Sequence, residues 1–154
     1  MREEDVEAVA RLRIETFFRD SDRTMAEDAA GLRKLLHGDG FERSFVARID
    51  AKPAGSILLV RHELEPAHAL TPWLAGLVVA ENFRGQGIGT ALVRAVEAHA
   101  RAVGADRLHL YTWAARNFYA ALGWQAVETI VQDGEPMLLM VRELATAPQD
   151  LPAR

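Results

Sequence analysis

Hydrophobic and polar residues alternate with the period of a helix in the first quarter of the chain. One stretch places hydrophobic side chains three or four residues apart: Val6, Ala10, Ile14 and Phe17. This spacing predicts an amphipathic helix with acidic residues 3–5 in its first turn, where the helix dipole favours them. A second helix is expected from Thr24, which has the spacing of a capping box with Glu27, to a stop at Gly38.

From residue 44 onward the pattern becomes that of strands. Residues 44–49 and 56–61 are predicted to pair as a hairpin around a turn at 51–55, which contains Pro53 and Gly55. Residues 64–72 contain two prolines and are expected to form an exposed loop. Residues 73–79 are continuously apolar, which is typical of a strand buried on both faces.

The second half begins with a glycine-rich turn and a predicted long helix from Thr90 to Val103, which Gly104 is expected to end. The hydrophobic stripe of this helix is predicted to contain Ile88, Leu92, Ala95, His99 and Val103. A strand at 108–111, a short helix at 114–122 and a hairpin of 124–131 with 136–142 follow. This order indicates a mixed α/β domain with one central sheet, which we assign to residues 1–144. The polar residues 145–154 are expected to form a frayed tail.

Length and composition narrow the class of protein. The 154 residues suffice for one domain, and the net charge of −4 argues against a protein that mainly coats nucleic acid or anionic lipid. The chain has no cysteine, which excludes disulfides, cysteine-ligated metals and a cysteine nucleophile, and which is easiest to reconcile with the cytoplasm. No apolar run approaches the roughly 18 residues of a membrane helix, and the N-terminus does not read as a signal peptide.

The glycine-rich turn is the most informative segment. Residues 84–89 read Arg-Gly-Gln-Gly-Ile-Gly between a predicted strand and a predicted helix. Such a turn leaves backbone N–H groups unpaired at the positive end of a helix, an arrangement that suits a pyrophosphate. The sequence lacks the Lys-Ser or Lys-Thr of a P-loop, and its third glycine stands one residue too early for the dinucleotide-binding fingerprint. Taken alone, the turn is equally compatible with a tight connection that binds nothing.

Two motifs together resemble the GCN5-related N-acetyltransferase (GNAT) family. Arg84, Gly87 and Gly89 match its Q/R-x-x-G-x-G/A signature, and residues 115–124, Ala-Arg-Asn-Phe-Tyr-Ala-Ala-Leu-Gly-Trp, match its A-x-x-F-Y-x-x-x-G-F/W block. The resemblance extends over roughly residues 6–144. It implies an acyl-CoA N-acyltransferase fold, a mixed and mostly antiparallel central sheet flanked by helices. Two neighbouring strands splay apart in this fold, and here they would be residues 73–79 and 108–111.

The resemblance also implies a site for acetyl-CoA as co-substrate. The pantetheine arm would pair with the backbone of Leu77 and Val79, beside Val78. The N–H of Val79 would also polarise the acetyl carbonyl. The pyrophosphate would lie on the turn and the first helical residues, which are Arg84, Gly85, Gln86, Gly87, Ile88, Gly89 and Thr90.

Three further positions are compared with the family's second block. Tyr119 matches the residue that protonates the departing thiolate in many members. Thr112 stands where members often have an asparagine that contacts the cofactor arm, and a threonine there is as readily explained as a cap of the following helix. Asn117 is a second position at which members place an asparagine, and it is kept as a cofactor-binding candidate.

The sequence leaves open which residue takes the proton from the attacking amine. Some members use a glutamate on the strand that here spans 73–79, and this strand contains none. The nearest polar candidates, acting directly or through water, are His62, Glu63, Glu65, His68 and Glu81. The simpler interpretation of each is a solvated loop residue. Many members also open with a strand before the first helix. With only residues 1–4 available here, that strand is missing or the start has been assigned too late.

Two functions follow from these motifs. The first is an N-acetyltransferase that moves an acetyl group from acetyl-CoA to a primary amine of a small molecule or peptide. Direct attack in a ternary complex is preferred, since no cysteine can carry the acyl group. The second is a non-catalytic acyl-CoA-binding sensor or subunit, suggested by the missing strand glutamate and by Thr112. Because Tyr119 is retained, we favour the enzyme. We expect no metal, nucleic acid or membrane partner, and a homodimer would cover the edge of the final hairpin.

Overall fold

The computed structural model describes residues 1–63, 69–132 and 134–144. The elements in chain order are η1 (Glu3–Asp5), α1 (Val6–Phe17), α2 (Met25–Leu36), β1 (Arg43–Ile49), β2 (Lys52–Val60), β3 (Trp73–Val79), η2 (Glu81–Phe83), α3 (Ile88–Ala102), β4 (Arg107–Thr112), α4 (Arg116–Ala121), β5 (Gln125–Gln132) and β6 (Glu135–Glu143). The strands form one sheet in the order β1-β2-β3-β4-β6-β5. β3 and β4 run parallel and the other neighbours antiparallel, which confirms the predicted fold class.

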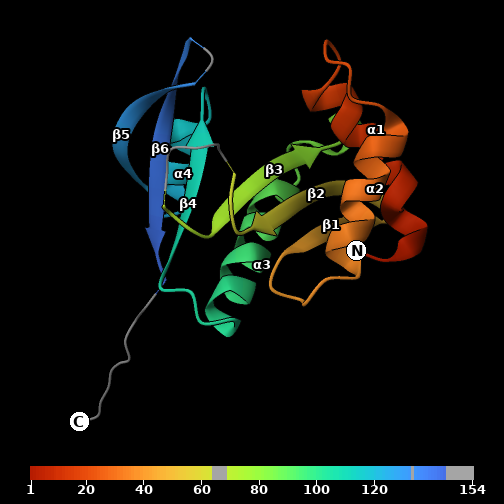
Figure 1. Cartoon of the computed structure of the whole chain (residues 1–154), viewed down its shortest axis with the longest axis horizontal. Coiled ribbons are helices and arrows are strands. Elements are labelled where there is room, and N and C mark those ends of the chain that lie inside the picture. Colours follow the sequence, from red (N-terminus) through yellow and green to blue (C-terminus); the bar gives the residue numbers. More distant parts are fainter. Residues whose placement is uncertain (64–68, 133, 145–154) are drawn as a thin grey trace.

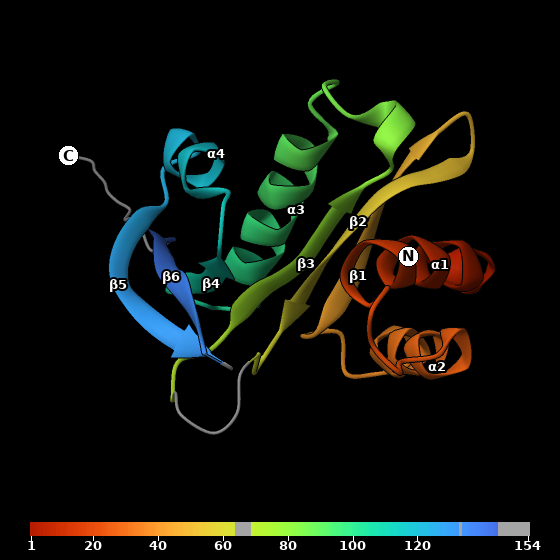
Figure 2. The same ribbon diagram turned by 90° about the horizontal axis from the view of Figure 1, so that it is seen from above.

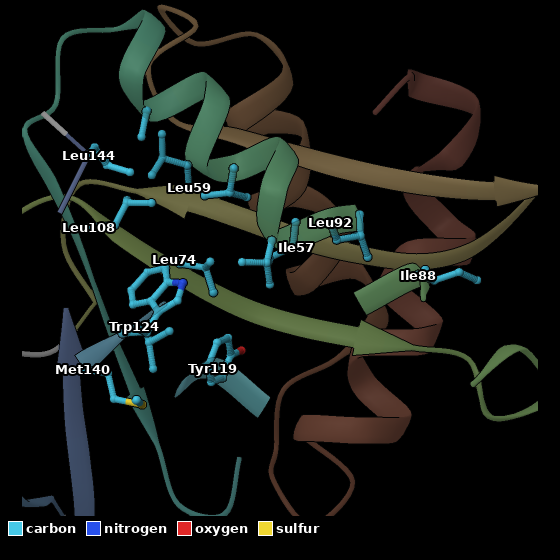
Figure 3. Packing of buried hydrophobic residues seen from close by; sticks show 14 of the residues in the cluster. Ile57, Leu59, Leu74, Ile88, Leu92, Leu108, Tyr119, Trp124, Met140 and Leu144 are labelled. Atoms are coloured by element: carbon cyan, nitrogen blue, oxygen red, sulfur yellow. The ribbon is translucent and has the colours of Figure 1, made fainter. Parts of the chain in front are cut away.

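The helices cover the two faces of the sheet (Figures 1 and 2). α1 and α2 pack on one face through a small cluster that includes Val9, Leu32 and Leu58. α3 and α4 pack on the other face, over the larger core in Figure 3, to which β2, β3, β4 and β6 all contribute. The domain therefore has three layers, and both helical layers reach β3, the strand that carries most of the site.

The sheet is divided between β3 and β4. The two strands pair at one position, Trp73 with His109, whereas β4 pairs with β6 along its whole length. Figure 2 shows β3 and β4 diverging beyond this point. The divergence agrees with the splayed strands that the family resemblance implies. It leaves the inner edges of two strands without a partner strand, and peptide groups on such edges can pair with an extended ligand.

Several local predictions are confirmed. The capping box at α2 forms, since Thr24 Oγ1 accepts from Glu27 N at 3.1 Å and Thr24 N donates to Glu27 Oε1 at 2.8 Å. Among the described residues no strand precedes α1, and the first residues form the short turn η1 instead. No helix in the described part of the chain is long and apolar enough to cross a bilayer. The expected tail, 145–154, lies outside the described residues.

Other local predictions are wrong. The first hairpin turns at Asp50 and Ala51, both with positive φ, and β2 begins at Lys52 instead of residue 56. Gly38 is not the left-handed stop of α2; Gly40 is the residue with positive φ there. Positive φ values are strained at Asp50 and Ala51 because neither residue is a glycine. The pairing of β1 with β2 imposes this turn in spite of the strain.

The buried faces of the two long helices are displaced from the predicted stripes. α1 buries Val6, Val9, Ala10 and Arg13, not Ile14 and Phe17. α3 buries Ile88, Leu92, Val93, Val96, Glu97 and Ala100. In each helix a charged residue occupies a core-facing position. Hydrophobic spacing alone cannot predict a buried charged residue. Both of these residues, Arg13 and Glu97, lie close to the site described below.

Candidate functional site

The turn into α3 presents an open row of backbone amides. Gly85 and Gly87 both have φ of +81°, and a Cβ atom at either would meet nothing within 4 Å. Left-handed φ values of this kind favour glycine. The amides of residues 88–90 belong to the first helical turn and have no acceptor within the helix. Ile88 is buried in the core and anchors the helix start. The turn is therefore accessible to an anion and is not filled by side chains.

A groove of about 590 Å³ extends from this turn along β3. Its walls come from β3, the turn, α4 and the end of α1, and include Leu77, Val79, Arg84 and Phe118. Gly89 allows α4 to approach the helix start, because a Cβ there would lie 3.4 Å from Phe118 Cζ. The groove brings together eight of the predicted cofactor residues besides Arg84: Leu77, Val78, Val79, Gly85, Gly87, Ile88, Gly89 and Thr90. Gln86 is exposed on the same turn.

On the edge of β3 that faces β4, the Val79 N–H has no partner strand, while the Val79 carbonyl accepts from Arg84. Ala80 N donates to Ala54 O at 2.8 Å, so the adjacent pair of Val79 with Gly55 is a non-hydrogen-bonded pair. The N–H and C=O of Val79 consequently point away from β2, toward the gap in the sheet. The Val79 carbonyl accepts from Arg84 Nε at 3.1 Å. Gly76, with φ of +64°, lies at a β-bulge opposite β2 and bends the strand beside the gap.

Tyr119 lies on α4, within the core that α3 and α4 cover, and is not among the residues that line the groove. Its side chain is 6 % exposed and contacts Phe118 and Trp124 edge-on, with ring centroids 5.0 and 5.9 Å away. Burial raises the pKa of the Tyr119 hydroxyl to about 12. The phenol therefore stays protonated throughout the neutral and mildly alkaline range, so its hydroxyl is available there as a proton donor.

Glu63 follows β2 and belongs to the opposite face of the sheet, beside Arg13. Although Glu63 is an exposed residue, partial burial of its carboxyl group raises its pKa to about 7, and the positive charge of Arg13 opposes the rise. Burial also raises the pKa of Tyr111, and the negative charges of Glu63 and Glu128 add to that rise. Tyr111 stacks on Trp73 with centroids 4.5 Å apart. A carboxylate that titrates near neutrality thus acts electrostatically on Tyr111, which lies on β4.

Arg13 is held in place by an ion-pair network between α1 and α2. Its guanidinium donates through Nε to Asp28 at 2.9 Å, and Arg23 Nε donates to the same carboxylate at 2.8 Å. Both guanidinium groups also lie over the ring of Phe18, at 5.8 and 5.3 Å. A Cβ atom at Gly76 would lie 2.7 Å from Arg13 Nη1, so the guanidinium packs directly on the bulge of β3.

The remaining predicted residues are placed differently. The Thr112 hydroxyl accepts from Ala115 N at 2.9 Å and caps the turn before α4, whose own N-cap is Ala115. Asn117 and His62 are exposed, and neither lines the groove along β3. Glu81 lies beside Arg84 in a second hollow, of about 460 Å³, at the end of α1. Glu65 and His68 lie outside the described residues. Within the described ranges, no three His, Asp or Glu side chains gather so that they could hold a metal ion.

Arg13 and Tyr111 are site residues that the sequence analysis missed. A signal for Arg13 existed, because it continues the series Val6, Val9, Ala10 on the buried side of α1, where a lone charged residue is unusual. Tyr111 had no such signal, since its neighbours depend on how far β3 and β4 diverge.

Comparisons with known proteins agree with this geometry. A family model described as the acetyltransferase (GNAT) family matches residues 6–124. N-alpha-acetyltransferase 80 of Mus musculus is 43 % identical over 67 residues, a match that spans 44 % of this chain and 21 % of that protein. The chain thus corresponds to about a fifth of the length of this curated relative.

Solved structures show the same fold at low sequence identity. An aminoglycoside 6'-N-acetyltransferase complexed with coenzyme A superposes with a TM-score of 0.75 at 18 % identity, covering 94 % of this chain and 93 % of the other. A ribosomal-protein-alanine N-acetyltransferase from Brucella melitensis gives 0.78 at 19 %, covering 94 % and 97 %. The family match over most of the chain, with the groove and turn where the motifs predict them, identifies the chain as a member of the GNAT family of acetyl-CoA-dependent N-acetyltransferases.

Proposed function

We propose that the protein transfers the acetyl group of acetyl-CoA to a primary amine of a small molecule or peptide, by direct attack in a ternary complex. The observation that carries the proposal is the continuity of the groove. It joins the amides of the glycine-rich turn to the free edge of Val79. One ligand with a pyrophosphate at one end and an amide-bearing arm at the other would match both features.

The residues present fit acetyl-CoA. The amides of residues 85–90, with Arg84, would hold the pyrophosphate, and the backbone of Leu77 and Val79 would pair with the pantetheine amides. Acetyl-CoA supplies the acetyl group as a thioester, an activated acyl donor. The N–H of Val79 faces the gap and would donate to the acetyl carbonyl oxygen, where negative charge develops during attack.

Glu63 and Tyr119 suit the two proton transfers. An amine near pKa ~10 is protonated at neutral pH and must lose a proton before it attacks. Glu63, with its pKa near 7, is the base we assign from among the candidates, directly or through a water molecule. Tyr119 would give its hydroxyl proton to the departing thiolate and recover a proton from the positively charged nitrogen of the tetrahedral intermediate. A thiol has a pKa near ~8.5, so the proton given to the thiolate helps without being indispensable.

The acceptor is assigned only as an amine. The acetyltransferases of similar fold are named for an aminoglycoside and for a ribosomal-protein alanine, which are a small-molecule and a protein acceptor. Near Glu63 lie the positive charge of Arg13 and the ring of Tyr111, which stacks on the buried Trp73. These groups would select among amines by shape and charge.

The first experiment follows free thiol from acetyl-CoA with a panel of metabolites, polyamines, aminoglycosides and peptides. We expect acceptor-dependent thiol release. Tight binding of acetyl-CoA without turnover on any acceptor would favour the alternative, a non-catalytic sensor or subunit. The absence of both acceptor-dependent thiol release and acetyl-CoA binding would contradict the assigned donor.

A matched pair of variants tests the pyrophosphate site. Gly87→Ala and Gly104→Ala both place a side chain at positive φ, +81° and +90°, with nothing within 4 Å, at opposite ends of α3. Each should lower the free energy of unfolding by about 1 kcal/mol. Only Gly87→Ala should weaken acetyl-CoA binding in calorimetry, because its methyl group projects into the site. Equal affinity in the two variants would place the pyrophosphate elsewhere.

A further inference from the structure

Glu97 is a buried carboxylate to which the proposed mechanism gives no role. It lies on α3 and is 2 % exposed, within the core between the helix and the sheet. Removing a carboxylate from water is costly unless several donors surround it. The groups that hydrogen-bond to the Glu97 carboxylate therefore indicate its role.

Two hydrogen-bond donors and one further cationic group surround the Glu97 carboxylate. Arg94 Nη1 donates to Oε1 at 2.8 Å, Trp124 Nε1 donates to Oε2 at 3.0 Å, and Arg142 Nε lies 3.7 Å from Oε2. The two arginines also donate to one turn of the backbone. Arg94 Nη1 reaches Leu122 O, and Arg142 Nη1 reaches Gly123 O, each at 3.1 Å. The cluster thus joins α3, β6 and the turn between α4 and β5.

That turn ends the helix that carries Tyr119. Trp124 N donates to Tyr119 O at 3.0 Å, and the Trp124 ring meets the Tyr119 ring edge-on, at 5.9 Å and 63°. Figure 3 shows both rings in the same buried cluster. α4 has six residues, and Tyr119 is the one it buries. Since so short a helix is not stable by itself, its position depends on these contacts.

We propose that Glu97 is a positioning residue for the reaction: through Trp124 it fixes the ring of Tyr119. The inference rests on the proposed role of Tyr119 as the proton donor to the thiolate. Glu97 and the pyrophosphate-binding turn stand on the same helix. α3 therefore sets the distance between the glycine-rich turn, which would hold the donor molecule, and Tyr119, which would protonate its leaving group.

The test is a double-mutant cycle between Tyr119 and each member of the chain that positions it. Trp124→Phe removes the indole N–H and keeps an aromatic ring, and Glu97→Gln removes the charge and keeps the shape. Glu143→Gln is the control, because Glu143 pairs with Arg107 at 3.2 Å and both side chains are more than half exposed. Each variant is combined with Tyr119→Phe, and kcat, KM for acetyl-CoA and the melting temperature are measured.

We expect Tyr119→Phe to lower kcat by about 10- to 100-fold, the low end of the range for a general acid. Trp124→Phe and Glu97→Gln should lower kcat about three- to tenfold with KM for acetyl-CoA unchanged. In the Tyr119→Phe background neither should have a further effect on kcat, since the hydroxyl that they position is gone. Glu143→Gln should change nothing.

Two results would overturn the inference, and they are distinguishable. If the kcat losses multiply in the double variants, Glu97 and Trp124 act on the fold and not through the Tyr119 hydroxyl. If Tyr119→Phe retains full kcat, the proposed role of Tyr119 fails and the positioning role falls with it. If Glu97→Gln does not fold, Trp124→Phe, which retains the packing, decides the question alone.

Discussion

The pH dependence of the reaction offers the sharpest test of Glu63 as the base. Its carboxyl group has a pKa near 7, because burial outweighs the opposing charge of Arg13. The reactive form is the carboxylate, which is present above that pKa and lost below it. About a tenth of Glu63 is ionised at pH 6 and about nine tenths at pH 8, so kcat/KM should rise roughly tenfold between these values.

The variant Glu63→Gln should have a different profile. Without the carboxylate, only the unprotonated fraction of the amine can react. For an amine near pKa ~10 this fraction grows about tenfold with each pH unit, or about a hundredfold from pH 6 to 8. The wild-type profile should be flat from pH 8 to 9, while that of the variant should keep rising. Tyr119, with its pKa near 12, should cause no decline in this range.

Initial rates of thiol release across pH 6–9, with one acceptor and saturating acetyl-CoA, measure both profiles. Glu81→Gln is the control, because Glu81 is the other described carboxylate among the candidates and lies beside Arg84 in the second hollow. It should retain the wild-type profile. Superimposable profiles for the wild type and Glu63→Gln would refute the assignment, and a changed profile in Glu81→Gln would transfer the role to that residue.

Two further predictions concern stability. Asp28→Asn should lower the free energy of unfolding by about 3 kcal/mol in denaturant titrations, because it leaves the buried Arg13 without its anionic partner. A loss below about 1 kcal/mol would mean that the ion pair between Arg13 and Asp28 contributes no more than an exposed pair does. Burial lowers the pKa of His109 below its usual 6.5, against the opposing bond to the Pro72 carbonyl. Below pH 6.5 the unfolded chain therefore binds a proton at His109 that the folded chain does not bind. The free energy of unfolding should decrease as the pH is lowered from 6.5. In melting curves, His109→Gln should reduce this pH dependence.

The sequence predicts the parts of this protein whose signals are local. The apolar run 73–79 is β3, the capping box at Thr24 forms, and the glycines at 85 and 87 adopt the backbone that their pattern implies. Each depends on neighbouring residues in the chain. The tight turn at Asp50 and Ala51 is not predictable in this way, because the pairing of β1 with β2 decides it.

In the candidate site, too, the part formed by neighbouring residues was predicted from the sequence, and the part formed by distant residues was not. The donor groove is assembled mainly from two continuous segments, so motifs locate it. The acceptor face brings together Arg13, Glu63 and Tyr111, which are far apart in the sequence and carry no shared pattern. His109 shows the same limit. It is 3 % exposed because it sits where β3 and β4 meet, and these strands are far apart in the sequence.

The single pairing of β3 with β4 has a mechanical consequence. The sheet consists of two half-sheets that meet where β3 contacts β4, and α3 packs mainly on the half formed by β1, β2 and β3. A ligand bound between β3 and β4 would contact both half-sheets and hold them together. Its free energy of binding would then add directly to the resistance of the domain against thermal opening.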